Sequence, residues 1–137
     1  TLLQIDLTKR EVTRNRKLNR SASAGQAAAF SADGAFVAAT DLYKIRVWNL
    51  ASSGEMPTCE DNETLWTLAF TPDGNRLLAG GRGKVDVWDF KKQRKIYSQA
   101  TADTGYVQCL AISPDSKHIA AIPSSAGQDL QVFRLPP

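Results

Sequence analysis

Side chains that usually carry enzyme chemistry are scarce in this sequence. The chain of 137 residues has a single histidine, His118, and two cysteines, Cys59 and Cys109. Two cysteines do not make the disulfide framework of a small secreted domain, and we expect both to be free thiols. One histidine and two distant cysteines cannot supply the ligands of a common zinc site. The sequence therefore predicts no metal, no cofactor and no set of catalytic residues.

Long apolar runs are also missing. No stretch approaches the ~18 residues of a membrane span, and the first twenty residues lack the apolar core of a signal peptide. The composition, 42% hydrophobic and 23% charged, is that of a soluble globular protein. We expect a cytoplasmic or other intracellular location and no membrane contact. Because the sequence begins at Thr1 without a methionine, the question of whether a segment precedes Thr1 stays open.

Two short segments occur three times each in this chain. The first ends in a turn-forming sequence and is found at Phe30–Gly34, Phe70–Gly74 and Ile112–Ser116. The second centres on an aromatic residue and is found at Val47–Leu50, Val87–Phe90 and Val132–Leu135. Successive copies begin 40 to 45 residues apart. A repeat of this length predicts stacked copies of one small structural unit.

Residues 64 to 100 show the content of one unit. An apolar segment ends at Pro72-Asp73-Gly74, an order that favours a tight hairpin turn because glycine supplies the positive φ. A second turn is predicted at Gly80–Gly83, where a phosphate-loop interpretation fails because no serine or threonine follows Lys84. We expect four strands, named A to D in chain order: Leu65–Phe70, Arg76–Ala79, Val85–Trp88 and Lys95–Gln99.

The strands of a unit differ in polarity. The inner ones are apolar at nearly every position, which is typical of a sheet covered on both faces. Strand D is charged, at Lys95–Gln99 and at Glu11–Leu18, as expected for an outer edge in water. Such sheets, repeated at this spacing, are blades of an all-β propeller. The alanine-rich stretch 22–29 is not assigned to a helix, because Gly25 interrupts it and the repeat places 27–30 on strand A.

At these positions the chain resembles the WD-repeat (tryptophan-aspartate repeat) β-propellers. Trp88-Asp89 matches the dipeptide after which the family is named, Trp48-Asn49 is close to it, and Phe133-Arg134 is a degenerate copy. The resemblance covers almost the whole chain. It implies four-stranded blades and a rim, formed by the D–A and B–C loops, at which partners bind.

The sequence also departs from the family pattern. Members often carry a Gly-His pair between strands D and A and an aspartate before strand C, which join a hydrogen-bonded network with the tryptophan. Here the turn positions hold Leu42 and Arg82. The D–A segments contain no histidine: 21–26, 56–63 and 100–105. We expect blades without that network that depend more on apolar packing, and we interpret His118 as a solvated strand residue.

The strands add up to about three blades. We divide the chain into the end of a preceding blade (1–20, strands C and D), two full blades (21–63 and 64–105) and an incomplete last blade (106–137, strands A to C). Closed propellers have about four to eight blades, so the predicted fold is a partial β-propeller. The favoured interpretation is the C-terminal arc of a longer polypeptide. Completion of the ring by other copies of the chain is the alternative.

The first functional hypothesis is a non-enzymatic scaffold that binds a protein or peptide partner through the D–A and B–C loops. Tyrosines on a rigid framework are good contact residues. The residues proposed for this rim are Leu42, Tyr43, Arg82, Asp103 and Tyr106. The aromatic residues of the C strands are instead interpreted as packing between blades.

Two alternatives stay open. The arc could be the regulatory or substrate-recruiting module of a larger enzyme with an upstream catalytic domain. The basic stretch 9–20 could contact nucleic-acid phosphates, although no aromatic residues accompany it for base stacking. A propeller enzyme that uses the centre of the ring is disfavoured, because apolar residues stand near the starts of the A strands: Ala27, Leu65 and Val107.

Overall fold

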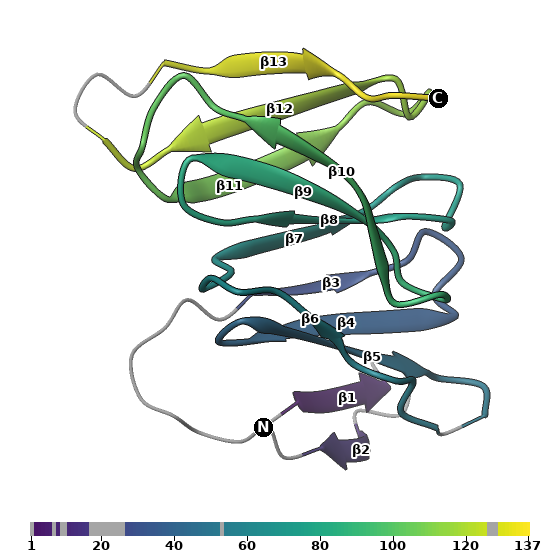
Figure 1. The fold of residues 1–137 in the computed structure, drawn as a ribbon. Coiled ribbons are helices and arrows are strands. Elements are labelled where there is room, and N and C mark those ends of the chain that lie inside the picture. Colours follow the sequence, from purple (N-terminus) through teal and green to yellow (C-terminus); the bar gives the residue numbers. More distant parts are fainter. Residues whose placement is uncertain (1, 7, 9–10, 17–26, 53, 126–128) are drawn as a thin grey trace.

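The computed structural model describes all residues except 1, 7, 9–10, 17–26, 53 and 126–128 (Figure 1). The described part consists of strands, turns and loops and contains no helix. The strands are β1 Leu2–Asp6, β2 Glu11–Arg16, β3 Ala28–Phe30, β4 Phe36–Asp41, β5 Lys44–Asn49, β6 Cys59–Glu60, β7 Thr67–Phe70, β8 Leu77–Gly80, β9 Lys84–Asp89, β10 Arg94–Ala100, β11 Val107–Ile112, β12 His118–Pro123 and β13 Gln131–Arg134.

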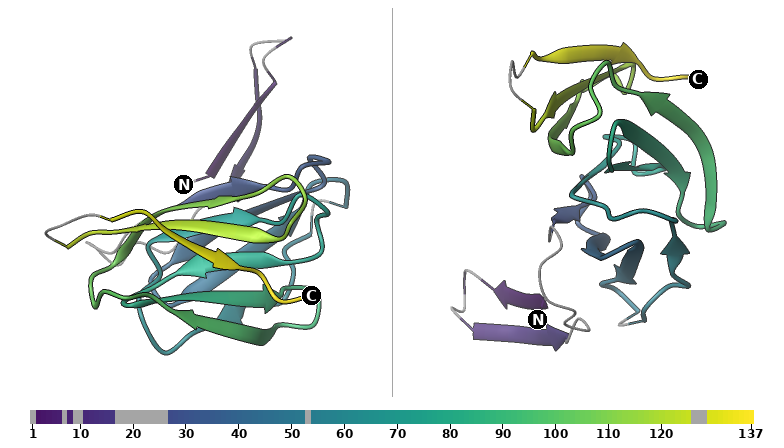
Figure 2. Two further views of the ribbon diagram at one scale, coloured as in Figure 1. Left: turned by 90° about the horizontal axis from the view of Figure 1, so that it is seen from above. Right: turned by 60° about the vertical axis from the view of Figure 1, so that its left-hand side comes forward.

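These strands form four antiparallel sheets, each built from consecutive strands. We name them blade I (β1–β2), blade II (β3–β6), blade III (β7–β10) and blade IV (β11–β13). Blades II, III and IV stack on one another, and the stack bends into an open arc (Figures 1 and 2). The prediction of an all-β partial propeller is confirmed. The alanine-rich stretch enters β3 at Ala28, while its residues 22–26 lie outside the described part.

The inner strands are covered on both faces. β4, β8 and β9 each have four successive buried residues, and successive side chains of a strand point to opposite faces. β10 alternates between exposed and half-buried positions, so it lies at the outer edge of blade III. The polarity of the strands predicted both results.

The turn between strands A and B is held by its own side chains. In blade III the Thr71 hydroxyl donates to Asp73 Oδ1 (2.5 Å) and accepts the backbone N–H of Arg76 (3.0 Å). Asp73 Oδ1 also accepts the N–H of Asn75 (3.0 Å), and Gly74 has φ of 70°. The same hydroxyl–carboxylate pair recurs at Ser31–Asp33 and Ser113–Asp115. The thrice-repeated segment is therefore a closed local network of hydrogen bonds.

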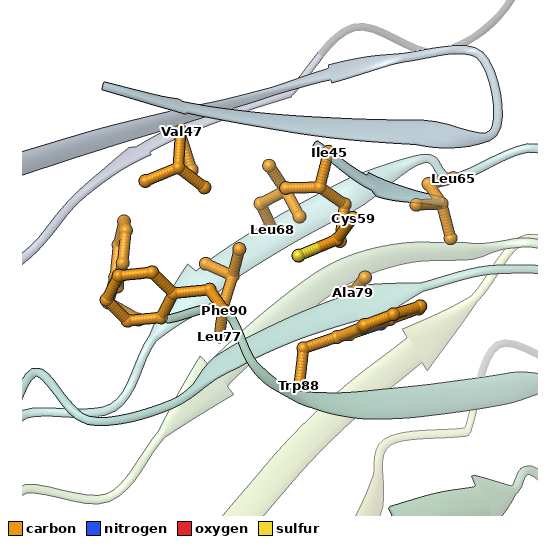
Figure 3. Packing of buried hydrophobic residues seen from close by; sticks show 11 residues of the cluster. Ile45, Val47, Cys59, Leu65, Leu68, Leu77, Ala79, Trp88 and Phe90 are labelled. Carbon is orange, nitrogen blue, oxygen red and sulfur yellow. The ribbon is translucent and has the colours of Figure 1, made fainter. Parts of the chain in front are cut away.

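An apolar cluster fills the contact between blades II and III (Figure 3). Phe90 of this cluster is fully buried, and its ring packs in an edge-to-face arrangement with those of Phe36 (5.3 Å between ring centres) and Phe70 (5.4 Å). Trp88 belongs to this cluster and is buried. The repeated aromatic residue of blade III thus packs between blades, as predicted.

Cys59 also belongs to this cluster, although it stands in a polar stretch of sequence. It forms β6 with Glu60, which pairs with Lys44 and Ile45 of β5. This short strand corrects the prediction that 56–63 is only a connecting loop. Both cysteines are free thiols, as expected, and Cys109 is exposed. Burial raises the pKa of the Cys59 thiol to about 11.

Blades III and IV pack through a second apolar cluster, to which Leu78, Val85 and Val87 contribute from blade III. The backbones approach closely at Gly80. A Cβ atom placed there would lie 2.5 Å from Thr67 Cγ2 and 2.8 Å from Val107 Cβ. A glycine at this position is therefore what permits the two sheets to meet.

The two ends of the stack expose apolar side chains that equivalent positions bury. Phe30 of blade II is 61% exposed, whereas Phe70, forty residues later, is 8% exposed. In blade IV, Val132 is 61% exposed, whereas its counterpart Val87 is fully buried. Phe30 and Val132 therefore mark the faces on which no further blade is stacked in the described part.

Candidate partner-binding rim

The B–C turn of blade II holds the following D–A loop through its backbone. The carbonyl of Leu42, a residue with φ of 58°, accepts the N–H of Leu65 (2.9 Å). The carbonyl of Tyr43 accepts the N–H of Asp61 (2.7 Å). Because these backbone groups fix the turn, the exposed Tyr43 side chain projects from a rigid support.

The B–C turn of blade III holds its own D–A loop in a similar way. Arg82 and Tyr106 form a β-bridge. Arg82 Nε donates to the Thr104 carbonyl (3.3 Å), and the guanidinium carbon lies 5.9 Å from the centre of the Tyr106 ring. The Tyr106 ring in turn packs on Trp66, with 4.4 Å between ring centres. Arg82 and Tyr106 are both exposed, yet each side chain is supported by contacts with neighbouring residues.

These two turns border one hollow at the junction of blades II and III. Its volume is about 370 Å³. It is lined by Tyr43, Asn62, Glu63, Thr64, Arg82 and Tyr106. The structure therefore brings together three of the five residues predicted for the rim, from segments about forty and twenty residues apart in the sequence.

The other two predicted residues do not line the hollow. Leu42 is half-buried. Asp103 Oδ1 accepts the N–H of Gly105 (2.7 Å), and its Oδ2 accepts the Ser125 hydroxyl. The hydrogen bond from Ser125, followed by that from Gly105, lowers the pKa of the Asp103 carboxyl. Asp103 thus shapes the D–A loop of blade III.

Sequence reasoning missed three residues of the hollow, Asn62, Glu63 and Thr64. The available signal was the run of four polar residues from Asp61 to Thr64, directly before an apolar strand. A polar run at that place predicts a surface loop on the same rim as the B–C turns.

The loop 61–64 is anchored by a buried ionic cluster, which we name the Asp61 cluster. Lys95 Nζ lies 2.7 Å from Asp61 Oδ2 and 2.9 Å from Asp86 Oδ2. Lys84 Nζ lies 3.4 Å from Asp61 Oδ1 and 3.1 Å from Asp86 Oδ2. Both aspartate side chains are fully buried. One aspartate comes from blade II and the other three residues from blade III, so the cluster ties the two blades together.

This cluster adds an ionic contact to the apolar packing that was expected between the blades. Lys95 Nζ lies 5.2 Å from the centre of the Trp88 ring, so the ions and the repeated tryptophan share one site. The buried Nε1 of Trp88 has no acceptor among the described residues.

The Asp61 carboxyl stays charged despite its burial. Burial raises its pKa, but the hydrogen bond from Lys95, the interaction with the Asp86 carboxyl, the N–H of Asn62 and the charge of Lys84 together outweigh this effect and lower the pKa to about 2. Asp61 and Lys95 therefore form an ion pair at neutral pH.

Other candidates from the sequence have simpler structures. His118 is exposed at the start of β12. Gly83, with φ of 65°, lies in the turn between β8 and β9. Within the described ranges, no group of three or more His, Cys, Asp or Glu side chains could hold a metal ion. In the same ranges, no helix is long and apolar enough to cross a membrane.

The basic stretch 9–20 is described only in part. Residues 11–16 form β2, on which Arg14 and Arg16 stand two positions apart. Lys9, Arg10, Lys17 and Arg20 lie outside the described residues. Nucleic-acid contact through this stretch stays a hypothesis.

Comparison with known proteins agrees with this architecture. Residues 55–89 match the family of the WD domain, G-beta repeat, which confirms the resemblance at the segment ending in Trp88-Asp89. The chain is 30% identical over 95 residues to U3 small nucleolar RNA-associated protein 12 of Saccharomyces cerevisiae. That match covers 56% of this chain and 10% of the yeast protein.

A solved structure has the same fold over nearly the whole chain. The hydrazine synthase of Kuenenia stuttgartiensis superimposes with a TM-score of 0.80 and 21% identity. The match covers 96% of this chain and 39% of that chain. At this identity the likeness concerns the fold. This chain thus spans a tenth of the yeast relative and about two fifths of the hydrazine synthase chain.

Proposed function

We propose that this WD-repeat-like arc is a non-enzymatic scaffold inside the cell, which binds a protein or peptide partner at the hollow between blades II and III. The observation that carries the proposal is the convergence of Tyr43, Arg82 and Tyr106 on one hollow. Tyrosine and arginine are enriched among residues that dominate binding energy. Each of the three is supported by backbone pairing or ring stacking, so little side-chain freedom is lost on binding.

The test begins with peptides selected from a random displayed library on the 137-residue chain. Tyr43→Ala is expected to weaken the selected peptides by about tenfold, because it removes an exposed ring without touching a core cluster. Lys92→Ala, in the exposed turn after β9, is the matched control on the opposite rim. Isothermal calorimetry measures affinity, and urea unfolding checks that the variants fold. Equal affinity of both variants for every selected peptide would contradict the proposal.

A second proposal concerns the open faces marked by Phe30 and Val132. We infer that further blades of a longer polypeptide cover them, since the same positions in blades II and III are buried by a neighbouring blade. That this chain spans a tenth of its yeast relative supports the inference. Light scattering on the chain tests it: a monomer or an irregular aggregate is expected, while a discrete ring of a few copies would favour completion by other copies.

The name of the yeast relative, an RNA-associated protein, favours one alternative function, association with RNA. Contact with RNA would involve the basic stretch 9–20. The measurement is the anisotropy of a labelled single-stranded RNA at several salt concentrations. Replacing Arg14 and Arg16 by alanine should reduce both the affinity and its salt dependence. Unchanged binding, or none by the parent chain, would leave this alternative without support. A role as a module of a larger enzyme is decided by upstream sequence.

A further inference from the structure

The hollow between blades II and III contains a cation without an ionic partner. Around it, the described ion pairs join Lys44 to Glu60 (2.9 Å) and Asp61 to two lysines. No ion pair among the described residues includes Arg82, although Arg82 lines the hollow. An arginine without an ion pair on the wall of a hollow is available to a ligand.

The Arg82 guanidinium is also oriented before any ligand arrives. Its Nε–H donates to the Thr104 carbonyl (3.3 Å), and its guanidinium carbon lies 5.9 Å from the centre of the Tyr106 ring. No hydrogen bond joins its terminal nitrogens to a described residue. A guanidinium held along one edge presents its free N–H groups in a fixed fork, the arrangement that matches the two oxygens of a carboxylate.

A second charge limits what can bind. Glu63 lines the same hollow, so a ligand with more than one negative charge at this point would meet repulsion. A carboxylate has a single charge, whereas a phosphate group carries close to two at neutral pH. Glu63 therefore favours a carboxylate over a phosphorylated side chain. It also favours a basic residue near that carboxylate.

We propose that the partner's peptide places a glutamate or aspartate side chain in this hollow, where its carboxylate binds Arg82 between the rings of Tyr43 and Tyr106. The inference rests on the proposed function and specifies the chemistry of the partner. The hydroxyl of Thr64 and the amide of Asn62, on the remaining wall, are available to the peptide backbone.

The experiment uses four hexapeptides with blocked termini, all of which contain a phenylalanine. They differ only at the central position next to this phenylalanine, which is glutamate, glutamine, phosphoserine or lysine. The chain is labelled with ¹⁵N-arginine, and the Nε–H resonance of Arg82 is followed by NMR during titration. The glutamate peptide should shift this resonance and bind about tenfold more tightly than the glutamine peptide. Arg82→Gln should remove that difference, while Arg94→Gln, on the exposed edge of β10, should preserve it.

The outcomes separate this inference from the proposed function. If glutamine binds as well as glutamate, and Tyr43→Ala still weakens both, the rim binds peptides but the carboxylate assignment is wrong. Tighter binding of the phosphoserine peptide would overturn the role given to Glu63. If the glutamate peptide leaves the Arg82 resonance unmoved, the inference fails, whatever the library selection shows. Shifts confined to residues away from the hollow would contradict both proposals.

Discussion

Blades II and III carry the same pair of charges with the signs exchanged. In blade II, Arg46 and Glu55 form a bidentate pair, with Nε–Oε1 at 2.7 Å and Nη2–Oε2 at 2.9 Å. Forty residues later the same positions hold Asp86 and Lys95, with Nζ–Oδ2 at 2.9 Å. In both blades the second residue of the pair, Glu55 or Lys95, lies opposite the repeated tryptophan. The repeat therefore conserves an ion pair beside a tryptophan and leaves its polarity free.

The two pairs differ in what surrounds them. The side chain of Glu55 is 36% exposed, whereas that of Asp86 is fully buried. In each blade the cation, Arg46 or Lys95, lies 5.2 Å from the centre of the tryptophan ring. The pair in blade III also contacts a carboxylate that lies outside its own blade, that of Asp61. The same local motif thus lies near the surface in blade II, whereas in blade III it connects two blades.

The largest expected effect breaks this comparison at its buried member. Asp86→Ala leaves two lysines beside one aspartate in a buried site and should lower the free energy of unfolding by about 3–5 kcal/mol. Glu55→Ala, the matched change at the more exposed pair, should cost below about 1 kcal/mol. Urea unfolding followed by tryptophan fluorescence measures both. Similar losses in the two variants would show that burial does not distinguish the pairs.

Exchanging the charges sharpens the comparison. Asp86→Lys alone places three cations around Asp61, whereas Asp86→Lys combined with Lys95→Asp restores two charges of each sign. We expect the double variant to be more stable than Asp86→Lys by about 2–3 kcal/mol. The exchange Arg46→Glu with Glu55→Arg in blade II should be tolerated within about 1 kcal/mol. Additive losses for the buried exchange would mean that the polarity of the Asp61 cluster is fixed.

Acid should selectively weaken the ionic contact between Asp61 and the lysines of blade III. The folded pKa of Asp61, about 2, lies below the ordinary value of 3.8. Its contribution to stability, at most about 2.5 kcal/mol, is therefore complete above about pH 5 and is lost as the pH falls through 4 toward 2. Urea midpoints between about pH 2 and 5 should fall less steeply in Asp61→Asn than in the parent chain or in the exposed control Asp129→Asn. Parallel profiles would contradict this.

The smallest effect concerns the close approach at Gly80. Blade II has Thr40 at the equivalent position, where its hydroxyl accepts the N–H of Ala27 (2.9 Å). Gly80→Thr should cost about 1–2 kcal/mol, because the new side chain meets Thr67 and Val107. Thermal unfolding is the measurement, and Gly54→Thr, in an open turn, serves as the control. A neutral Gly80→Thr would show that blade IV can shift away at little cost.

Sequence alone predicted what depends on neighbours in the chain. The hydroxyl–carboxylate turn at Thr71 draws all its partners from within five residues, so its repeat could be recognised and its hairpin expected. The polarity of the strands and the exposure of Tyr43 could also be predicted, because both depend on residues that are close together in the chain. In contrast, Asp61 meets Lys95 across thirty-four residues and two blades. Nothing in the spacing of these two residues points to the contact, because it arises from the way the sheets stack.

The rim shows the same division. That Tyr43, Arg82 and Tyr106 lie on one rim could be predicted, because turns on one edge of a repeat unit must gather on one edge of the stack. That they share a hollow with Glu63 depends on how far the blades are rotated against each other. β6 was missed because two residues, Cys59 and Glu60, are too short to show alternation.

The self-contained A–B turns have a consequence for how such a chain grows. Because each turn brings its own hydrogen-bond partners, a tandem duplication of some forty codons would deliver a hairpin that folds in its new position without changes elsewhere. The charged pair of blade III is less independent, because Lys95 also contacts Asp61, which precedes that blade in the chain. After a duplication, selection would therefore act first on the charged positions beside the tryptophans. The opposite polarities at 46/55 and 86/95 agree with such a history.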